Sequence, residues 1–412
     1  MVISRFLGCA LAAAMLVSCS DPEPIIEYRY SAYEGDAYPD RLPEITIPEG
    51  GMGVVSDSLS DTISLISLAT GERFGVHPVG RDPVTIDGPH HVAVDAEGGA
   101  LYVALSYPDV AGAIGPHAVH GGSAVAGYVQ KLALDDLRIL GQVRVEANPG
   151  DIVISEDGRR VVVSHFDLKR VLDNPGDVEA ARSSLAVIDP EKVGLSGSSD
   201  PVFIPVCMAA HGVALSRPDG ARAYVACYGE DVLAIVDLTD PSAEVKRVPV
   251  GSTSNPSPHA SNYGPYAAVM SPDGKTIAVS STESRDVRFF DVASETFDDS
   301  RKILTIGAPY FAAWTPDGSA IYVPTQVPDT IVRIGVTPDD NEVVTRNIAE
   351  ECMRPHLAQL DEEHGLFLVC EGDRSTTPGK VLRLDPETLE TLSDTEVGLY
   401  PDGLVRVAPE AP

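Results

Sequence analysis

A short pattern that recurs along most of this chain limits what it can fold into. Residues 264–292 show it in full: an apolar run, a Ser-Pro-Asp-Gly turn at 271–274, a β-rich run, a polar turn and a third apolar run. Proline presets φ for the turn and glycine tolerates positive φ, so the chain reverses there, while valine, isoleucine and phenylalanine suit a pleated surface. The pattern predicts three short consecutive strands, and strands this short need neighbouring sheets.

The pattern returns with a period of about 40 to 60 residues, which is typical of propellers and solenoids. Six complete units are present, and a proline usually precedes the first strand of a unit. The first strands begin at His90, Gly150, His211, Tyr266, Tyr310 and His356.

The two ends of the repeat region complement each other. Residues 51–79 have the pattern of a second, third and fourth strand, whereas residues 400–407 have the pattern of a first strand with nothing after it. Pairing them gives a seventh unit and removes an exposed sheet edge that would otherwise invite aggregation. The sequence therefore predicts an all-β, seven-bladed β-propeller with four-stranded blades over residues 51–408, in which one blade takes strands two to four from the N-terminal side and its first strand from the C-terminal side.

The N-terminus has the features of a targeting segment. Arg5 supplies a basic charge, residues 6–17 form an apolar run too short to span a bilayer comfortably, and Leu-Val-Ser-Cys at 16–19 resembles the lipobox of bacterial lipoproteins. We expect a lipoprotein signal peptide over residues 1–18, lipidation of Cys19, and a polar, lipidated tether over residues 19–50. A plain secretory signal with an incidental cysteine is the alternative. By resemblance to the sorting rule of enteric lipoproteins, Ser20 favours the outer membrane, so we expect an envelope protein anchored on its periplasmic or outer surface.

The charge of the chain excludes one class of partner. The formal net charge is −31 over 412 residues, and such a field repels phosphate backbones, so nucleic acid is a poor partner. The excess of acidic residues indicates a protein that stays soluble outside the cytoplasm. The alternative explanation is that acidic loops bind calcium. We expect a monomer whose partner is an envelope protein or a small ligand.

The hairpins are followed by runs such as Leu-Tyr-Val-Ala at 101–104, Tyr-Val-Ala-Cys at 224–227 and Ile-Tyr-Val-Pro at 321–324. These runs resemble the YVTN β-propeller repeat family, and the resemblance covers nearly everything after Gly51. The chain departs from the family pattern at an insertion over residues 167–183 and at Glu-His-Gly 363–365, which replaces the usual turn. The resemblance implies the fold. It does not select an activity, because similar propellers serve as scaffolds, binding modules and enzyme subunits.

First strands begin, and second strands end, on one face of a propeller, which we call the upper face. Three imidazoles, two phenols and a carboxylate open first strands there. We consider His90, His211 and His356 as ligands of copper or zinc, with Tyr266, Tyr310 or Asp402 completing the shell. Two alternatives stay open: rings that are only hydrogen-bonded in a wet channel, and a metal-free pocket for a small ligand. Non-adjacent blades could hold the rings too far apart for bonds of ~2.0–2.1 Å.

The cysteines repeat in two units of the chain. A cysteine lies four residues before His211 and another four residues before His356, and in both units a second cysteine ends the second strand. In an exported protein such cysteines indicate disulfides worth roughly 3 kcal/mol each. Four cysteines permit three pairings, of which the local one, Cys207 with Cys227 and Cys352 with Cys370, is the simplest. Joint metal binding by Cys207 and His211 is the rival interpretation, but four extended residues cover about 13 Å.

Familiar catalytic signatures are absent from the sequence, including the nucleophile elbow, the phosphate-binding loop and the zinc-protease helix. The leading hypothesis is therefore a binding module that acts through its upper face. The alternative is a metal-dependent redox or lyase enzyme centred on the histidines. Insertions at 107–126 and 167–183 are where we expect a partner to bind. Upper-face acids that could act as general bases are Asp151, Asp231, Glu283 and Asp402.

Overall fold

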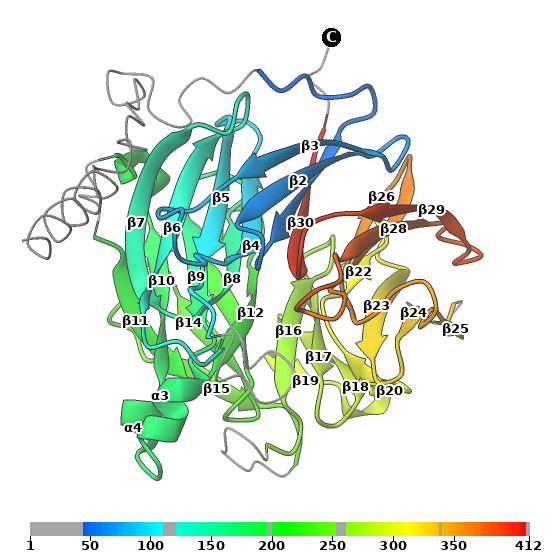
Figure 1. The fold of residues 1–412 in the computed structure, drawn as a ribbon. Coiled ribbons are helices and arrows are strands. Elements are labelled where there is room, and N and C mark those ends of the chain that lie inside the picture. The colour runs from blue at the N-terminus through cyan, green and yellow to red at the C-terminus, as the bar shows by residue number, and fades with distance from the viewer. Residues whose placement is uncertain (1–43, 110–120, 196–199, 253–260, 338–339, 409–412) are drawn as a thin grey trace, which may run out of the picture. The chain divides into compact units, whose positions relative to one another are not determined.

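Seven antiparallel sheets follow one another around a common axis (Figure 1). The structure is a computed structural model that describes residues 44–109, 121–195, 200–252, 261–337 and 340–408. Every sheet has four strands along its main path, and two sheets carry one additional short strand. The predicted all-β, seven-bladed propeller is confirmed.

The blade that joins the two ends of the chain closes the ring. Strands β1 (Met52–Asp57), β2 (Thr62–Ser67) and β3 (Arg73–Pro78) continue the sheet started by β30 (Pro401–Val407). β1 and β30 pair antiparallel, with Val54 opposite Val405. Figure 1 shows β30 beside the N-terminal strands of this sheet. The predicted closure is therefore confirmed, and we number this sheet blade 1.

The remaining blades follow in chain order. Blade 2 contains β4 (Pro89–Asp95), β5 (Ala100–Leu105), β6 (Ala126–Ala133) and β7 (Ile139–Ala147). Blade 3 contains β8 (Pro149–Ile154), β9 (Val161–His165), β10 (Ser183–Ile188) and β11 (Val202–Cys207). Blade 4 contains β12 (Ala210–Leu215), β13 (Arg222–Cys227), β14 (Val232–Asp237) and β15 (Lys246–Pro249).

Blade 5 contains β16 (Pro265–Met270), β17 (Thr276–Ser281), β18 (Asp286–Asp291), β19 (Thr296–Phe297) and β20 (Ile303–Leu304). Blade 6 has a first strand split into β21 (Ala308–Pro309) and β22 (Ala313–Trp314), followed by β23 (Ala320–Gln326), β24 (Thr330–Gly335) and β25 (Val343–Asn347). Blade 7 contains β26 (Pro355–Asp361), β27 (Gly365–Cys370), β28 (Lys380–Leu384) and β29 (Thr391–Glu396).

The insertion predicted in blade 3 forms two short helices, α3 (Leu168–Asp173) and α4 (Val178–Ala181). Each begins at an aspartate whose side chain accepts a backbone N–H three residues later, which is the usual N-cap arrangement. Two 3-10 helices, η2 (Pro190–Lys192) and η3 (Asp299–Arg301), lie in other connections. Among the described residues, no helix is both long enough and apolar enough to span a bilayer.

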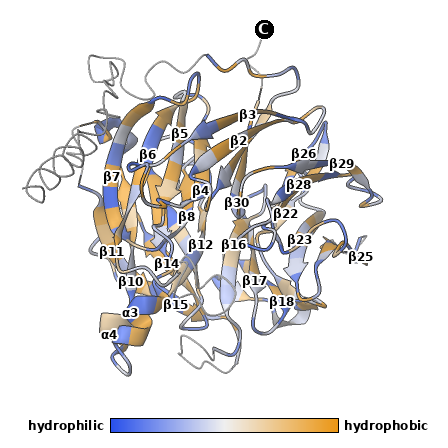
Figure 2. Ribbon diagram, in the orientation of Figure 1, coloured by the Kyte–Doolittle hydropathy of each residue, from blue (hydrophilic) through white to orange (hydrophobic). Residues whose placement is uncertain are grey.

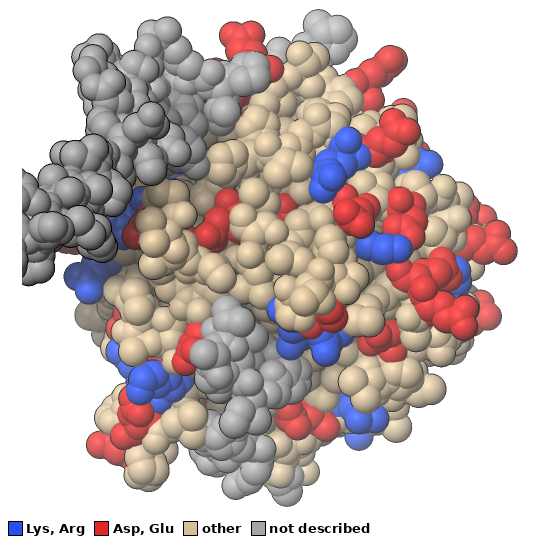
Figure 3. Space-filling view, in the orientation of Figure 1, with Lys and Arg blue, Asp and Glu red and all other residues tan. Residues whose placement is uncertain are grey.

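The hydrophobic core lies between neighbouring blades. Apolar side chains of β5 and β9, for example, form one buried cluster that includes Tyr102 and Val163. Apolar colour accordingly follows the strands in Figure 2, whereas charged side chains are spread over the surface in Figure 3. Ile45 and Ile47 pack against the core of blades 1 and 2.

In six of the seven blades, a similar turn precedes the first strand at the upper face. The residue directly before the strand has a positive φ, and only two of these residues are glycines. Register shifts follow within the first strands of blades 2, 3, 4, 5 and 7. A bulge lets consecutive residues face the same side of a strand, so these turns control which side chains reach the axis. The residues with positive φ are Gly88, Asn148, Ala209, Gly264, Arg354 and Tyr400.

Candidate functional site

The residues predicted to open the first strands lie together at the upper end of the axial channel, which we call the channel mouth. In the structure each is the second residue of its strand, except Tyr310, which directly follows β21. His90, His211 and His356 are completely buried. The ring centroids of His90 and His211 are 5.9 Å apart, and those of Tyr310 and His356 are 5.5 Å apart. The structure thus gathers the predicted imidazoles and phenols at one end of the channel.

His211 lies in an aromatic environment. Its ring stacks on Tyr266 with 4.0 Å between centroids and an interplanar angle of 25°. Phe166 contacts it edge-on at 4.9 Å, and Phe311 lies 5.5 Å away. Burial raises the pKa of the Tyr266 phenol well above its usual range, so the stacked ring carries a neutral hydroxyl.

His356 lies between carboxylates instead. Its Nδ1 is 3.5 Å from Oδ1 of Asp402 and 3.8 Å from Oε1 of Glu371. One ligand atom from each of these three residues lies within 4.8 Å of the other two. Within the described ranges, this is the one group of histidines, cysteines and acids close enough to hold a metal ion.

Neighbouring side chains hold both carboxylates in place. Asp402 Oδ2 accepts a hydrogen bond of 2.8 Å from the Ser58 hydroxyl. Glu371 Oε2 accepts one of 2.7 Å from Nε of Arg374, whose guanidinium lies 4.9 Å from the centre of the Tyr400 ring. Burial raises the pKa of Glu371, with the charge of Asp402 in the same direction and Arg374 opposing both.

The predicted ligand set and the observed group overlap in part. His356 and Asp402 belong to both, while His90, His211, Tyr266 and Tyr310 stay predictions as ligands. Burial raises the pKa of Tyr310 as well, which keeps its phenol protonated. We did not predict Glu371, although it directly follows Cys370 at the end of a second strand. Because second strands end on the upper face, this position was the one signal in the sequence that could have identified Glu371.

A second pair of polar residues lies directly below the channel mouth. Nδ1 of His91 is 2.9 Å from Oδ1 of Asp151, and both side chains are buried. We predicted a role for Asp151 but not for His91. The ring centroids of His90 and His91 are only 4.6 Å apart, so the two neighbours lie on the same side of the strand.

The other predicted acids have structural partners. The Asp231 carboxylate accepts hydrogen bonds from the backbone N–H groups of Asn262, Tyr263 and Gly264. The exposed Glu283 carboxylate accepts a hydrogen bond of 2.7 Å from the Tyr228 hydroxyl.

Both predicted disulfides are present, Cys207 with Cys227 and Cys352 with Cys370. Each joins the chain just before a first strand to the end of the adjacent second strand. Disulfides of this kind are typical of extracytoplasmic proteins.

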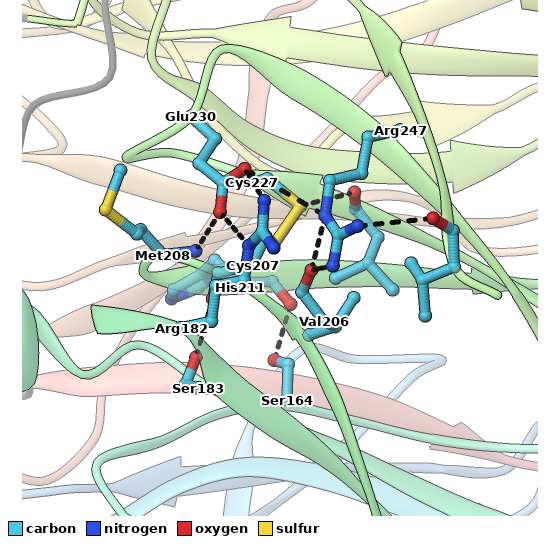
Figure 4. Close-up of a disulfide and its surroundings, with 12 residues drawn as sticks. Ser164, Arg182, Ser183, Val206, Cys207, Met208, His211, Cys227, Glu230 and Arg247 are labelled. Carbon is cyan, nitrogen blue, oxygen red and sulfur yellow. Dashed lines mark hydrogen bonds and ion pairs between the residues drawn. A yellow bond between two sulfur atoms is a disulfide. The ribbon is translucent and has the colours of Figure 1, made fainter. Parts of the chain in front are cut away.

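Figure 4 shows the environment of the blade 4 disulfide. Glu230 accepts the Met208 backbone N–H and hydrogen bonds from Arg182, which comes from the blade 3 insertion. These contacts connect the insertion to the turn that precedes His211.

Several predicted positions lie outside the described residues. They are the signal peptide, Cys19, most of the tether, and residues 110–120 of the insertion at 107–126.

No protein-family model matches the sequence, and neither does any curated protein. Solved structures do match the fold. A putative 6-phosphogluconolactonase from Bacteroides uniformis aligns with a TM-score of 0.60 and 14% identity over 87% of this chain and 100% of its own. The periplasmic gluconolactonase of Pseudomonas aeruginosa aligns with a TM-score of 0.60 and 17% identity, over 87% of this chain and 99% of its own. Hydrazine synthase of Kuenenia stuttgartiensis aligns with a TM-score of 0.55 and 17% identity, over 81% of this chain and 100% of its own.

These likenesses define the class of protein. The chain is a seven-bladed β-propeller similar in fold to lactonase-type and YVTN-like propellers. At such low identity the likeness concerns the fold alone.

Proposed function

We propose that this protein is an envelope binding module whose channel mouth binds one divalent transition-metal ion, zinc above copper. The observation that carries the proposal is the buried group of His356, Glu371 and Asp402, whose ligand atoms lie within 4.8 Å of one another. Imidazole nitrogen and carboxylate oxygen are common zinc ligands, and three protein ligands leave a position for water or a bound molecule.

The two distances from His356 Nδ1 to the carboxylates are close to those expected around one ion. Two ligand atoms at ~2.1 Å from a tetrahedral metal are about 3.4 Å apart. The His356–Asp402 separation of 3.5 Å is already close to this value, and the His356–Glu371 separation of 3.8 Å needs a shift of a few tenths of an ångström.

The local charge also supports a cation. Burial and the charge of Asp402 raise the pKa of Glu371, whereas Arg374 and Arg354 lower it, so a divalent ion beside these two completely buried carboxylates would favour their ionised form. Buried charges need compensation, and a divalent ion at these three ligands supplies it. Zinc has no strong geometric demand, whereas copper prefers a tetragonal arrangement, which is why zinc comes first.

Elemental analysis tests this proposal. The purified full chain, stripped with a chelator and reloaded with zinc, should retain about one ion per chain after gel filtration. Glu371→Gln should retain far less, while Glu283→Gln, which changes an exposed upper-face acid, should behave like the wild type. Retention of no metal by the wild type, or equal retention by Glu371→Gln, would contradict the proposal.

We further propose that the chain is anchored in the envelope through Cys19, as its lipobox-like sequence at 16–19 indicates. The disulfides support an extracytoplasmic location. Radiolabelled palmitate should label the wild-type chain in cells and leave Cys19→Ala unlabelled, and outer-membrane fractions should contain the labelled protein. Label on Cys19→Ala would contradict the anchor. The metal-dependent redox or lyase enzyme stays a prediction from the sequence.

A further inference from the structure

A separate cavity of about 330 Å³ occupies the channel below His91. All seven blades contribute to its wall through their first strands. Its open end lies near Glu156 and Arg217, half-exposed residues on the lower face that form an ion pair of 3.2 Å. The wall between is largely apolar and includes Val153, Val213, Val269, Ala312, Leu357 and Leu404.

His91 and Asp151 provide the polar groups at the inner end of this cavity. Asp151 Oδ1 accepts the backbone N–H of Ile152, and Oδ2 accepts that of Val213, each at 2.9 Å. The carboxylate therefore acts as an acceptor toward His91, whose Nδ1 carries the shared proton. In the neutral imidazole this leaves the lone pair on Nε2 as an acceptor.

No described residue donates a hydrogen bond to that acceptor. His91 is 3% exposed, and its Nε2 makes no hydrogen bond within the part of the chain that the structure describes. A buried acceptor without a partner is costly, and such groups in native proteins call for an explanation. Here the imidazole lines a cavity large enough for a small organic molecule.

From these observations we infer that the lower channel binds a small, neutral, largely apolar molecule with a hydroxyl or N–H group that donates to His91 Nε2. The apolar wall removes the ligand body from water, and the imidazole held by Asp151 selects for the donor. The inference is independent of the proposed metal, because this cavity is lined by other residues than Glu371 and Asp402.

Indole and N-methylindole form a matched pair of probes, because only indole carries a donor. Calorimetric titration of the full chain should show saturable binding of indole at least fivefold tighter than that of N-methylindole. His91→Phe keeps a ring but removes the acceptor, so it should bring the two affinities within twofold of each other.

A second variant tests the place of binding. Val269 lines the cavity without belonging to an inter-blade core cluster, so Val269→Trp should fill the cavity, leave the fold intact by circular dichroism, and abolish binding of both probes. Three results would overturn the inference: no saturable binding of indole up to its solubility, equal affinity of the wild type for both probes, or undiminished binding to Val269→Trp. The wild-type comparison stands even if a variant fails to fold.

Discussion

Blades 4 and 7 build the same local structure around different chemistry. In both, a disulfide fixes the turn before the first strand, and a histidine opens that strand four residues after the first cysteine. The residue after the second cysteine is Tyr228 in blade 4 and Glu371 in blade 7. The residue that opens the next blade is Tyr266 in one case and Asp402 in the other.

Equivalent backbone positions thus carry His-Tyr-Tyr on one side of the channel and His-Glu-Asp on the other. His211 stacks on a phenol ring at 4.0 Å, whereas Nδ1 of His356 lies 3.5 Å from a carboxylate oxygen. The repeat fixes the backbone position of the imidazole. Two neighbouring side chains determine whether it packs in an aromatic cluster or belongs to the proposed metal site. In this propeller a site therefore belongs to a pair of neighbouring blades.

The largest expected effect concerns what the two blades share. Replacing both cysteines of either disulfide by serine should lower the free energy of unfolding by about 3 kcal/mol, because the unfolded chain is then no longer restricted by the cross-link. The two losses should be similar, since the cysteines are 20 and 18 residues apart. Denaturant titration measures the loss. Only the blade 7 double variant should also weaken zinc binding, since that disulfide flanks His356 and Glu371. An equal loss of zinc affinity in both variants would show that blade 4 contributes to the site.

The second prediction separates the two imidazoles. His356→Ala should weaken zinc binding by about 100-fold, because it removes one of three protein ligands. His211→Ala is the matched control and should change the affinity by less than about threefold. Calorimetry on chelator-stripped protein measures both constants. A large effect of His211→Ala would restore the three-histidine site that the sequence suggested.

The third prediction concerns the titration of Glu371 and of Tyr228, its equivalent in blade 4. Burial raises the pKa of Glu371 above its ordinary value of 4.5, so the folded chain binds more protons than the unfolded chain above that pH. Stability from this group is full below about pH 4.5 and is lost as pH rises through the raised pKa, with a slope of at most about 1.4 kcal/mol per pH unit.

Unfolding of metal-free protein between pH 5 and pH 8 tests this slope. Glu371→Gln should remove the share of the dependence that Glu371 causes, while the share from Asp57, whose pKa burial raises to about 6, should remain. Tyr228→Phe should leave it unchanged, because burial and the nearby Glu283 raise the pKa of the Tyr228 phenol, which therefore does not titrate in this range. A slope that is as steep in Glu371→Gln as in the wild type would mean that Glu371 does not contribute to it.

The sequence predicted the frame well because strand periodicity and turn residues are local signals. The closure of blade 1 also followed, since residues 51–79 and 400–407 each lacked what the other supplied. His91 was missed because strict alternation places it opposite His90, whereas the register shift between Pro89 and Val92 brings both to the channel.

Glu371 was missed for a different reason. Its partner in the metal-ligand group is Asp402 of blade 1, whose charge helps to raise the pKa of Glu371. No spacing in the chain reports such a contact, because the two positions are brought together by ring closure. The disulfides, by contrast, repeat in register and could be paired from the sequence.

The smallest effect is expected from an incomplete transplant between the two blades. In a His356→Ala background, Tyr228→Glu places a carboxylate beside His211, but the next blade still opens with the Tyr266 phenol. Two ligands hold zinc weakly, so the affinity should rise by less than about threefold. Adding Tyr266→Asp completes the set at the blade 4–blade 5 junction, and calorimetry should then show a clear gain. Tight binding after the single change would mean that one blade alone suffices and that the site does not need two neighbouring blades.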